Sequence, residues 1–381
     1  MKKAVWVAAA SGLVACAAAC GSSGEGSGSS GAGAATASTS GATGTMSTST
    51  SSGGATARVV ATIDLPGAPY GMAFNPTTKK AYFGCSVRSD AGFTVPAGIA
   101  VVDEGTNAVT TTIPTLNDVW SIAVDATTNT IYATDATGFI DVIDGAADTV
   151  KTTIQTNADD LAVDEAHGKV YALAGESVVV IDGASSAVTA TYPIDLTPAI
   201  DLSNGAHRIA VDPASQTVFV VGQDASLANT IITLDGTTGA VKSTASPTGY
   251  PTDVLPFGDT LAVLYVGAPS GITIGAAPEI PLDFTPTGFA SAGGSIYVAG
   301  YDPATGNPAL SVVDQGTRIQ VSLSGSGPSL AVPESVLGGI LAGTTAPSGS
   351  TFTVTLQADP SNPSNGTAPR QTVYELLFTD P

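Results

Sequence analysis

The chain has 381 residues, of which 12% are charged and 43% are hydrophobic, and it is rich in glycine and proline. This composition is typical of a turn-rich, all-β protein. The formal net charge of −20 repels polyanions, which excludes nucleic acids and anionic membrane surfaces as partners of the folded part. Two of the three cysteines lie near the N-terminus, which excludes a disulfide framework.

Residues 1–20 have the pattern of an export signal. Two lysines precede an apolar run over residues 4–15, which is shorter than a membrane span. The segment LVAC, which ends at Cys16, resembles the lipobox of bacterial lipoproteins, and AAAC, which ends at Cys20, is a second, looser match. The resemblance implies cleavage before Cys16 or Cys20 and lipidation of that cysteine. It also implies a place in the cell envelope, periplasmic or on the outer surface.

Residues 21–57 form a predicted tether. Apart from Glu25 and Met46, this stretch contains only Gly, Ser, Ala and Thr. Such a composition cannot bury a core, so we predict disorder. A flexible coil of this length would hold the folded domain, residues 58–381, roughly 35 Å from a membrane anchor.

The stretch Ser121–Thr156 contains four short apolar runs, each closed by a polar turn. These runs are rich in Val, Ile, Thr and Tyr, which favours strands. The run FIDVID (139–144) alternates with period two, as a half-buried strand does. None of the runs has the length or the period of a helix. Four antiparallel strands in about 40 residues predict one blade of a β-propeller.

The same pattern recurs along residues 58–381. The predicted first strands are 71–74, 121–124, 160–163, 208–211, 253–256, 288–291 and 329–332. Their average spacing of about 43 residues is that of four-stranded blades. We therefore predict a seven-bladed β-propeller, in which blades five and seven are the least regular.

The two ends of this domain predict how the ring closes. Arg58–Leu65 has the pattern of a fourth strand that lies before the first strand of blade one. It would complete the last blade and leave no free sheet edge. The segments 351–357 and 371–378 are both strand-like. One would be the third strand of blade seven, and the other an extra strand or a hairpin partner.

Repeats such as TIYATD (130–135) followed by FIDVIDGAADTVKTTI (139–154) resemble the YVTN-type β-propeller repeat. The resemblance extends from Arg58 to about Ala331 and is strongest in blades one to four. It implies a secreted or surface-attached protein. Related propellers serve as adhesins, as binding scaffolds or, less often, as enzymes, so the resemblance predicts the fold and leaves the function open.

Aspartates recur after the first and third strands of the repeats. They are Asp125, Asp164 and Asp212 in the first set and Asp103, Asp144, Asp182, Asp235 and Asp314 in the second. Cation binding is one interpretation, but the chain has no calcium-loop motif. We favour turn chemistry, in which the carboxylate accepts hydrogen bonds from nearby backbone N–H groups.

Residue pairs at the start of each first strand would cluster at one mouth of the central channel. These pairs are Tyr70-Gly71, Trp120-Ser121, Asp159-Asp160, His207-Arg208, Thr252-Asp253, Thr287-Gly288 and Pro328-Ser329. They differ from blade to blade and include residue types that dominate binding sites. The predicted ligand or partner site consists of Tyr70, Trp120, Asp159, Asp160, His207, Arg208 and Asp253. Alternatively, the aromatic residues pack between blades and the polar residues cap strand ends.

Catalytic motifs are sparse. His167 and His207 are the only histidines, and they stand in different blades, which excludes a metal site built of several histidines. His167 has the pattern of a solvated turn residue, and Cys85 that of a small buried residue on a strand. The enzymatic alternative is a lactonase-like hydrolase whose metal is held by Asp159, Asp160 and Asp253.

The leading functional prediction is a lipid-anchored binding scaffold for a protein or an envelope polymer. We expect a monomer without a cofactor that touches the membrane only through its lipid. A third possibility is that the outer loops 86–97 or 303–308 do the binding.

Overall fold

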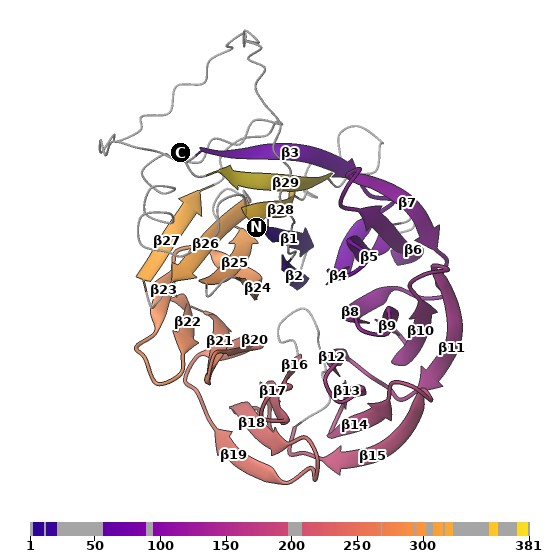
Figure 1. Cartoon of the computed structure of the whole chain (residues 1–381). Coiled ribbons are helices and arrows are strands. Elements are labelled where there is room, and N and C mark those ends of the chain that lie inside the picture. Colours follow the sequence, from indigo (N-terminus) through magenta and orange to yellow (C-terminus); the bar gives the residue numbers. More distant parts are fainter. Residues whose placement is uncertain are drawn as a thin grey trace, which may run out of the picture.

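The computed structural model describes residues 3–10, 13–20, 56–88, 94–196, 208–267, 269–292, 295–301, 308–314, 317–322, 350–356 and 372–379. These residues form six four-stranded sheets and one five-stranded sheet. Figure 1 shows the sheets arranged around a common centre, which is the architecture of a β-propeller. Ala68–Leu282 provide five consecutive four-stranded blades. The described part of the chain contains no helix with the length and apolar character needed to cross a membrane.

Each four-stranded sheet follows the chain from the centre outwards (Figure 1). The first strands, nearest the centre, are β4 (Ala68–Asn75), β8 (Val119–Asp125), β12 (Asp160–Asp164), β16 (Arg208–Asp212), β20 (Tyr250–Phe257) and β24 (Thr285–Ala292). The second strands are β5 (Lys80–Arg88), β9 (Thr130–Asp135), β13 (Lys169–Ala174), β17 (Thr217–Gln223), β21 (Thr260–Val266) and β25 (Ser295–Tyr301). The third strands are β6 (Thr94–Asp103), β10 (Phe139–Asp144), β14 (Ser177–Asp182), β18 (Asn229–Asp235), β22 (Ser270–Ile274) and β26 (Pro308–Asp314). The outermost strands are β7 (Ala108–Ile113), β11 (Thr149–Gln155), β15 (Ala187–Pro193), β19 (Val241–Ala245), β23 (Ile280–Leu282) and β27 (Thr317–Ser322).

The recurring aspartates are turn residues, as predicted. The Asp125 carboxylate accepts hydrogen bonds from the backbone N–H groups two and three residues on, at 2.9 and 3.0 Å. Asn129 ends that turn with a φ of 54°, a left-handed conformation that asparagine tolerates. The same bonding, to N–H groups two or three residues on, recurs at Asp103, Asp144, Asp164, Asp182, Asp212 and Asp235. The side chain of Asp314 lies outside the described residues.

Apolar seams and tyrosine hydroxyls join neighbouring blades. Each seam is filled by buried aliphatic and aromatic side chains from the two facing sheets. On β9, the Tyr132 hydroxyl donates to the carbonyl of Gly183 in the next blade, at 3.3 Å. On β13, the Tyr171 hydroxyl donates in the same way to Gly236, at 2.9 Å. Burial raises the pKa of both tyrosines to about 12, so these hydroxyls stay protonated and keep donating.

The outermost strands of the first four blades carry a β-bulge at the same position. The residue that the bulge leaves unpaired is Thr110, Lys151, Thr189 or Lys242. The two lysines lie 3.3 and 3.4 Å from the carboxylate of the preceding turn, and the two threonine hydroxyls donate to carbonyls of the third strand. Bulges and charges on an edge strand oppose pairing with another chain.

The five-stranded sheet joins the two ends of the chain. Its order is β2 (Leu13–Cys20), β1 (Lys3–Ala10), β28 (Ser350–Leu356), β29 (Thr372–Thr379) and β3 (Thr56–Asp64). The N-terminal strand β3 is outermost and antiparallel to β29, and it begins two residues before the predicted Arg58. Strands β28 and β29 are hairpin partners, which is one of the options that the sequence left open.

The inner edge of this sheet differs from the sequence prediction. Strand β1 pairs with β28 in parallel, whereas every other strand pair of the described residues is antiparallel. The sequence predicts a removable export signal for these same residues, and its removal stays a prediction. The strand predicted at 329–332, the tether as far as residue 55 and His207 lie outside the described residues.

Replacing Tyr171 by Phe removes one inter-blade hydrogen bond while keeping the aromatic ring. We expect Tyr171→Phe to lower the free energy of unfolding by about 1 kcal/mol, because the Gly236 carbonyl loses a donor. Urea denaturation followed by circular dichroism measures this. Tyr82→Phe is the matched control, because no hydrogen bond from the buried Tyr82 hydroxyl to a carbonyl of the next blade is present among the described residues. An equal loss in both variants would contradict the role given to the Tyr171 hydroxyl.

Candidate functional site at the channel mouth

The first strands begin with bulges at the predicted mouth. In β8, Val119 pairs with Asp135 and Ser121 pairs with Thr134, so Trp120 is left without a pairing partner. Equivalent irregularities involve Tyr70 and Gly71 in β4, Thr252 in β20 and Thr287 in β24. Bulges redirect a side chain and are frequent beside functional sites. Trp120, Tyr70 and Thr252 are all half-buried.

The second residue of several pairs links neighbouring blades. Ser121 Oγ donates to Asp160 Oδ1 at 2.7 Å, and the backbone N–H of Ile209 donates to Asp160 Oδ2 at 3.0 Å. Arg208 Nη1 lies 3.6 Å from Asp160 Oδ1. Asp160 is only 6% exposed, and its carboxylate therefore ties three blades together at the channel wall. The sequence predicted Asp160 as a site residue, and the structure gives it this linking role.

Between blades one and two, the first strands touch through their backbones. A Cβ atom built on Gly71 would lie 2.7 Å from the carbonyl oxygen of Trp120, which is closer than real Cβ contacts allow. Glycine is therefore required at position 71 for β4 to approach β8. This contact also fixes the backbone from which Trp120 projects.

Asp253 is the most strongly perturbed acid of the mouth. Burial raises its pKa to about 7, although the positive charge of Arg208 acts in the opposite direction and the negative charge of Asp160 reinforces the rise. The carboxylate accepts a hydrogen bond from the N–H of Val254 at 2.9 Å and another from the N–H of Phe289 in the next blade. Asp253 is partly exposed as a whole residue, but its carboxyl is enclosed by the surrounding protein.

Asp159 joins this group of acids. Its pKa is raised by burial and by the neighbouring charge of Asp160, while the backbone N–H of Gly175 donates a hydrogen bond that lowers it. The structure thus brings together Asp159, Asp160, Arg208 and Asp253, with Trp120 and Tyr70 on the bulges of two adjacent blades. His207, predicted as part of the same site, is not described.

The described residues do not assemble the metal site of the enzymatic alternative. No group of three His, Cys, Asp or Glu side chains among them has the arrangement needed to hold a metal ion. Both oxygens of Asp160 already accept hydrogen bonds from neighbouring blades. A hydrolase in which Asp159, Asp160 and Asp253 share a metal therefore has no support in this geometry.

Sequence reasoning missed a second polar cluster at the same end of the ring. Ser86 Oγ donates to Asp118 Oδ1 at 2.6 Å, and Asn117 Nδ2 donates to Asp135 Oδ2 at 2.7 Å. Burial would raise the pKa of Asp135, but hydrogen bonds from Thr137, Asn117 and Phe139 hold it below the usual value. Asn117 and Asp118 lie in the connection before β8, whereas Ser86 lies on β5 and Asp135 ends β9. All four lie outside the aligned first strands, and only the polar pair at 117–118 signals the cluster in the sequence.

Two other sequence predictions have clear outcomes. Cys85 is buried on β5, as predicted, and burial raises its thiol pKa to about 12, so the thiolate is not formed near neutral pH. His167 was predicted to be a solvated turn residue, and it is exposed in a turn, but it also has a partner that the sequence did not predict. Its ring Nδ1 lies 2.9 Å from the buried Asp164 carboxylate, because the turn folds the imidazole back over the end of β12.

Comparison with solved structures agrees with this architecture. A chain of the hydrazine synthase of Kuenenia stuttgartiensis aligns with a TM-score of 0.54 and 15% sequence identity, over 66% of this chain and 78% of that chain. A chain of a mitotic checkpoint complex aligns with a TM-score of 0.56 and 10% identity, over 85% of this chain and 92% of that chain. This chain has the β-propeller fold.

At these identities the likeness extends to the fold alone. No family model and no curated protein matches the sequence.

Asp253→Asn tests the electrostatics of the mouth. A carboxyl whose pKa rises from 3.8 to about 7 on folding makes the folded state less stable as pH increases through that window. We expect the free energy of unfolding of the unmodified chain to fall between about pH 4 and pH 7. Asp253→Asn should reduce this fall by roughly 1–3 kcal/mol.

Urea titrations at several pH values measure this effect. The exposed Asp259 provides the control variant, Asp259→Asn, which should keep the pH dependence of the unmodified chain. If stability depends on pH in the same way in the unmodified chain and in Asp253→Asn, the raised pKa of Asp253 is disproved.

Proposed function

We propose that this protein is a non-catalytic binding scaffold and that the channel mouth is its binding site. The observation that carries this proposal is the set of bulges at the starts of the first strands. They place Tyr70, Trp120 and Thr252 at shifts in the strand register, at positions where the repeat varies. Aromatic side chains on a rigid frame are typical anchors of protein interfaces.

The residues around these bulges support a binding role over a chemical one. Both carboxylate oxygens of Asp160 accept hydrogen bonds from neighbouring blades. Asp253 accepts hydrogen bonds from the backbone N–H groups of Val254 and Phe289. Because hydrogen bonds already hold the ring in place, less conformational entropy is lost when a partner binds. The partner is a protein or an envelope polymer, and the mouth would contact it through Trp120 and Tyr70.

Capture of a partner tests this function. The full-length chain is immobilised, and material retained from an envelope extract is compared between the unmodified chain, Trp120→Ala and Tyr70→Ala. We expect the retained partner to decrease at least tenfold in Trp120→Ala, because a central aromatic anchor accounts for about 2 kcal/mol or more of binding. Thr152→Ala on the exposed outer strand β11 is the control and should retain the partner fully. Equal capture by all variants would place the site elsewhere and refute the proposal.

We also propose that the protein is a lipid-anchored propeller of the cell envelope with seven blades related to the YVTN-type repeat. The lipobox-like segments before Cys16 and Cys20, the apolar run and the tether of small residues support export and anchoring. The repeat spacing and the number of sheets support the blade count. The protein would act as a monomer that is tethered at a distance from the membrane.

Export and anchoring would change the inner edge of the closing sheet. Cleavage before Cys16 or Cys20 removes β1, which pairs with the inner edge of β28. An unpaired edge of this kind promotes aggregation. The sequence predicts the first strand of blade seven at 329–332, so residues between β27 and β28 would supply the inner strands of this sheet.

Serine substitutions at the two cysteines test the anchor. In a bacterial host, we expect either Cys16→Ser or Cys20→Ser to abolish lipidation, because a serine cannot form the thioether. The double variant should leave the membrane fraction completely, and intact mass spectrometry identifies which cysteine begins the mature chain. Cys85→Ser is the control, since Cys85 is buried in the propeller. Retention of the double variant in the membrane fraction would refute the anchor.

A further inference from the structure

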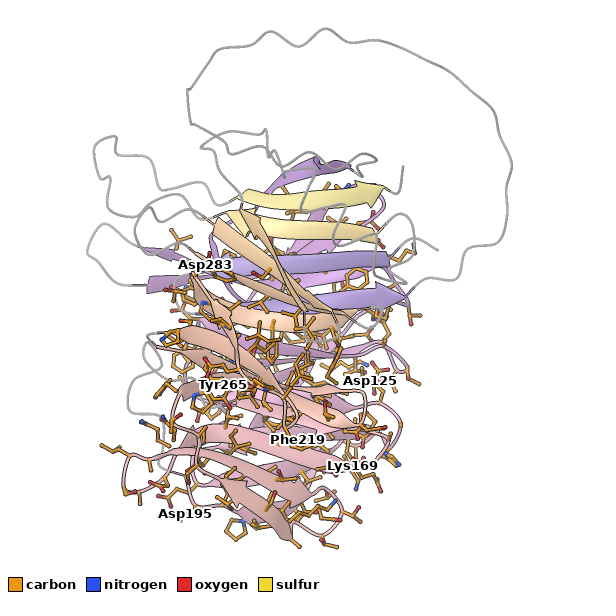
Figure 2. The ribbon with its side chains drawn as sticks, turned by 90° about the vertical axis from the view of Figure 1, so that its left-hand side faces the viewer. Asp125, Lys169, Asp195, Phe219, Tyr265 and Asp283 are labelled. Atoms are coloured by element: carbon orange, nitrogen blue, oxygen red, sulfur yellow. The ribbon has the colours of Figure 1, made fainter. Side chains whose placement is uncertain are left out.

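The predicted export signal supplies the two innermost strands of the five-stranded sheet. Strand β2 is innermost and β1 follows it, and the two form an antiparallel pair, the signal hairpin (Lys3–Cys20). Strand β2 lies against β24 and β4, the first strands of the sheets on either side (Figure 1). Figure 2 shows the five-stranded sheet from the side, with the indigo strands β1 and β2 beside the yellow strands β28 and β29. The signal hairpin therefore takes the places that first and second strands have in the other sheets.

The signal hairpin runs in the opposite direction to the strands whose places it takes. Strand β1 is parallel to β28, in register from Lys3 with Ser350 to Val7 with Val354. In each four-stranded sheet the second and third strands are antiparallel. A parallel pair is slightly less stable per residue than an antiparallel pair. An antiparallel strand would therefore be favoured over β1 at the inner edge of β28.

The chain contains a second candidate for the same two places. Five residues separate the first-strand run from the second strand in each of blades one to four. These connections are residues 75–79, 125–129, 164–168 and 212–216. The same interval separates SLAV (329–332) from the apolar run GGILAG (338–343). Both runs lie between β27 and β28, so in chain order they come directly before a third strand, as the first two strands of a blade do.

We infer that the inner edge of β28 accepts either of two strand pairs from this chain. The signal hairpin fills it before cleavage, and residues 329–343 fill it once the signal has been removed. The two pairs exclude each other, because the other edge of β28 is already paired with β29. In both states β28 has no open edge that could pair with another chain. This exchange rests on the proposed cleavage of the signal and does not depend on binding at the channel mouth.

Hydrogen–deuterium exchange of the full-length chain, measured by mass spectrometry, tests this exchange of strands. Val5→Pro disrupts β1 in the middle of its pairing with β28, because proline cannot donate to the strand ladder. We expect the amides of residues 338–343 to exchange at least tenfold more slowly in Val5→Pro than in the unmodified chain. The amides of residues 350–356 should stay as protected as before. Ser23→Pro in the predicted tether is the matched control and should change neither segment.

A proline in the second candidate separates the two occupants. Leu341→Pro alone should leave residues 350–356 protected, because the signal hairpin keeps its place. The double variant Val5→Pro/Leu341→Pro should expose them, with exchange at least tenfold faster, because neither pair can form. The buried strand β14 is the internal reference for the rest of the ring. If the double variant unfolds as a whole, the gain of protection at 338–343 in Val5→Pro alone still decides.

Three results would overturn the exchange of strands. The first is fast exchange of residues 350–356 in Val5→Pro, which would mean that nothing replaces the signal hairpin. The second is equal protection of residues 338–343 in Val5→Pro and in the unmodified chain. The third is loss of protection of residues 350–356 in Leu341→Pro alone, which would mean that the signal hairpin does not hold this edge. None of these results bears on the mouth, where capture by Trp120→Ala tests binding separately.

Discussion

The structure depends on how the first strands meet at the centre of the ring. These strands come closest together there, and their polar starts must be bonded because a buried carboxylate without partners is costly. Asp160 solves this by accepting hydrogen bonds from Ser121 and from the backbone of Ile209. Asp253 does the same with the backbone of Phe289. Each of these carboxylates bonds to the next blade, so the centre is held by directional polar links.

The contacts between blades change in kind from the centre outwards. Beyond the first strands, the seams are apolar, and a tyrosine hydroxyl from Tyr132 or Tyr171 reaches a carbonyl of the next blade. At the rim, bulges with Thr or Lys disrupt the edge of each sheet in the first four blades. Polar links therefore fix the geometry of the mouth, apolar seams provide most of the stability, and the rim prevents unwanted pairing.

The sequence predicted local patterns well and cross-blade contacts poorly. Asp125 and its counterparts were predictable because their hydrogen bonds reach only two or three residues along the chain. The linking role of Asp160 was not predictable, since its donors, Ser121 and Ile209, are 39 and 49 residues away. Trp120 stood out only because it broke the repeat, and its bulge depends on pairing with β9. The pairing of β1 with β28 was missed because nothing local in either segment specifies the other.

Residues that link the blades at the mouth, such as Asp160, and residues on bulges, such as Trp120, have different consequences for function. A substitution at Asp160 disturbs the links among three blades. A loss of binding in such a variant would therefore not distinguish a lost contact with the partner from a distorted mouth. Trp120 is only half-buried, and the bulge leaves it without a paired residue on β9. The fold should tolerate a substitution at this position better than a substitution at Asp160, which is hydrogen-bonded across blades. Variation from blade to blade is therefore concentrated where the frame permits it, and that is where a partner can be selected without loss of the fold.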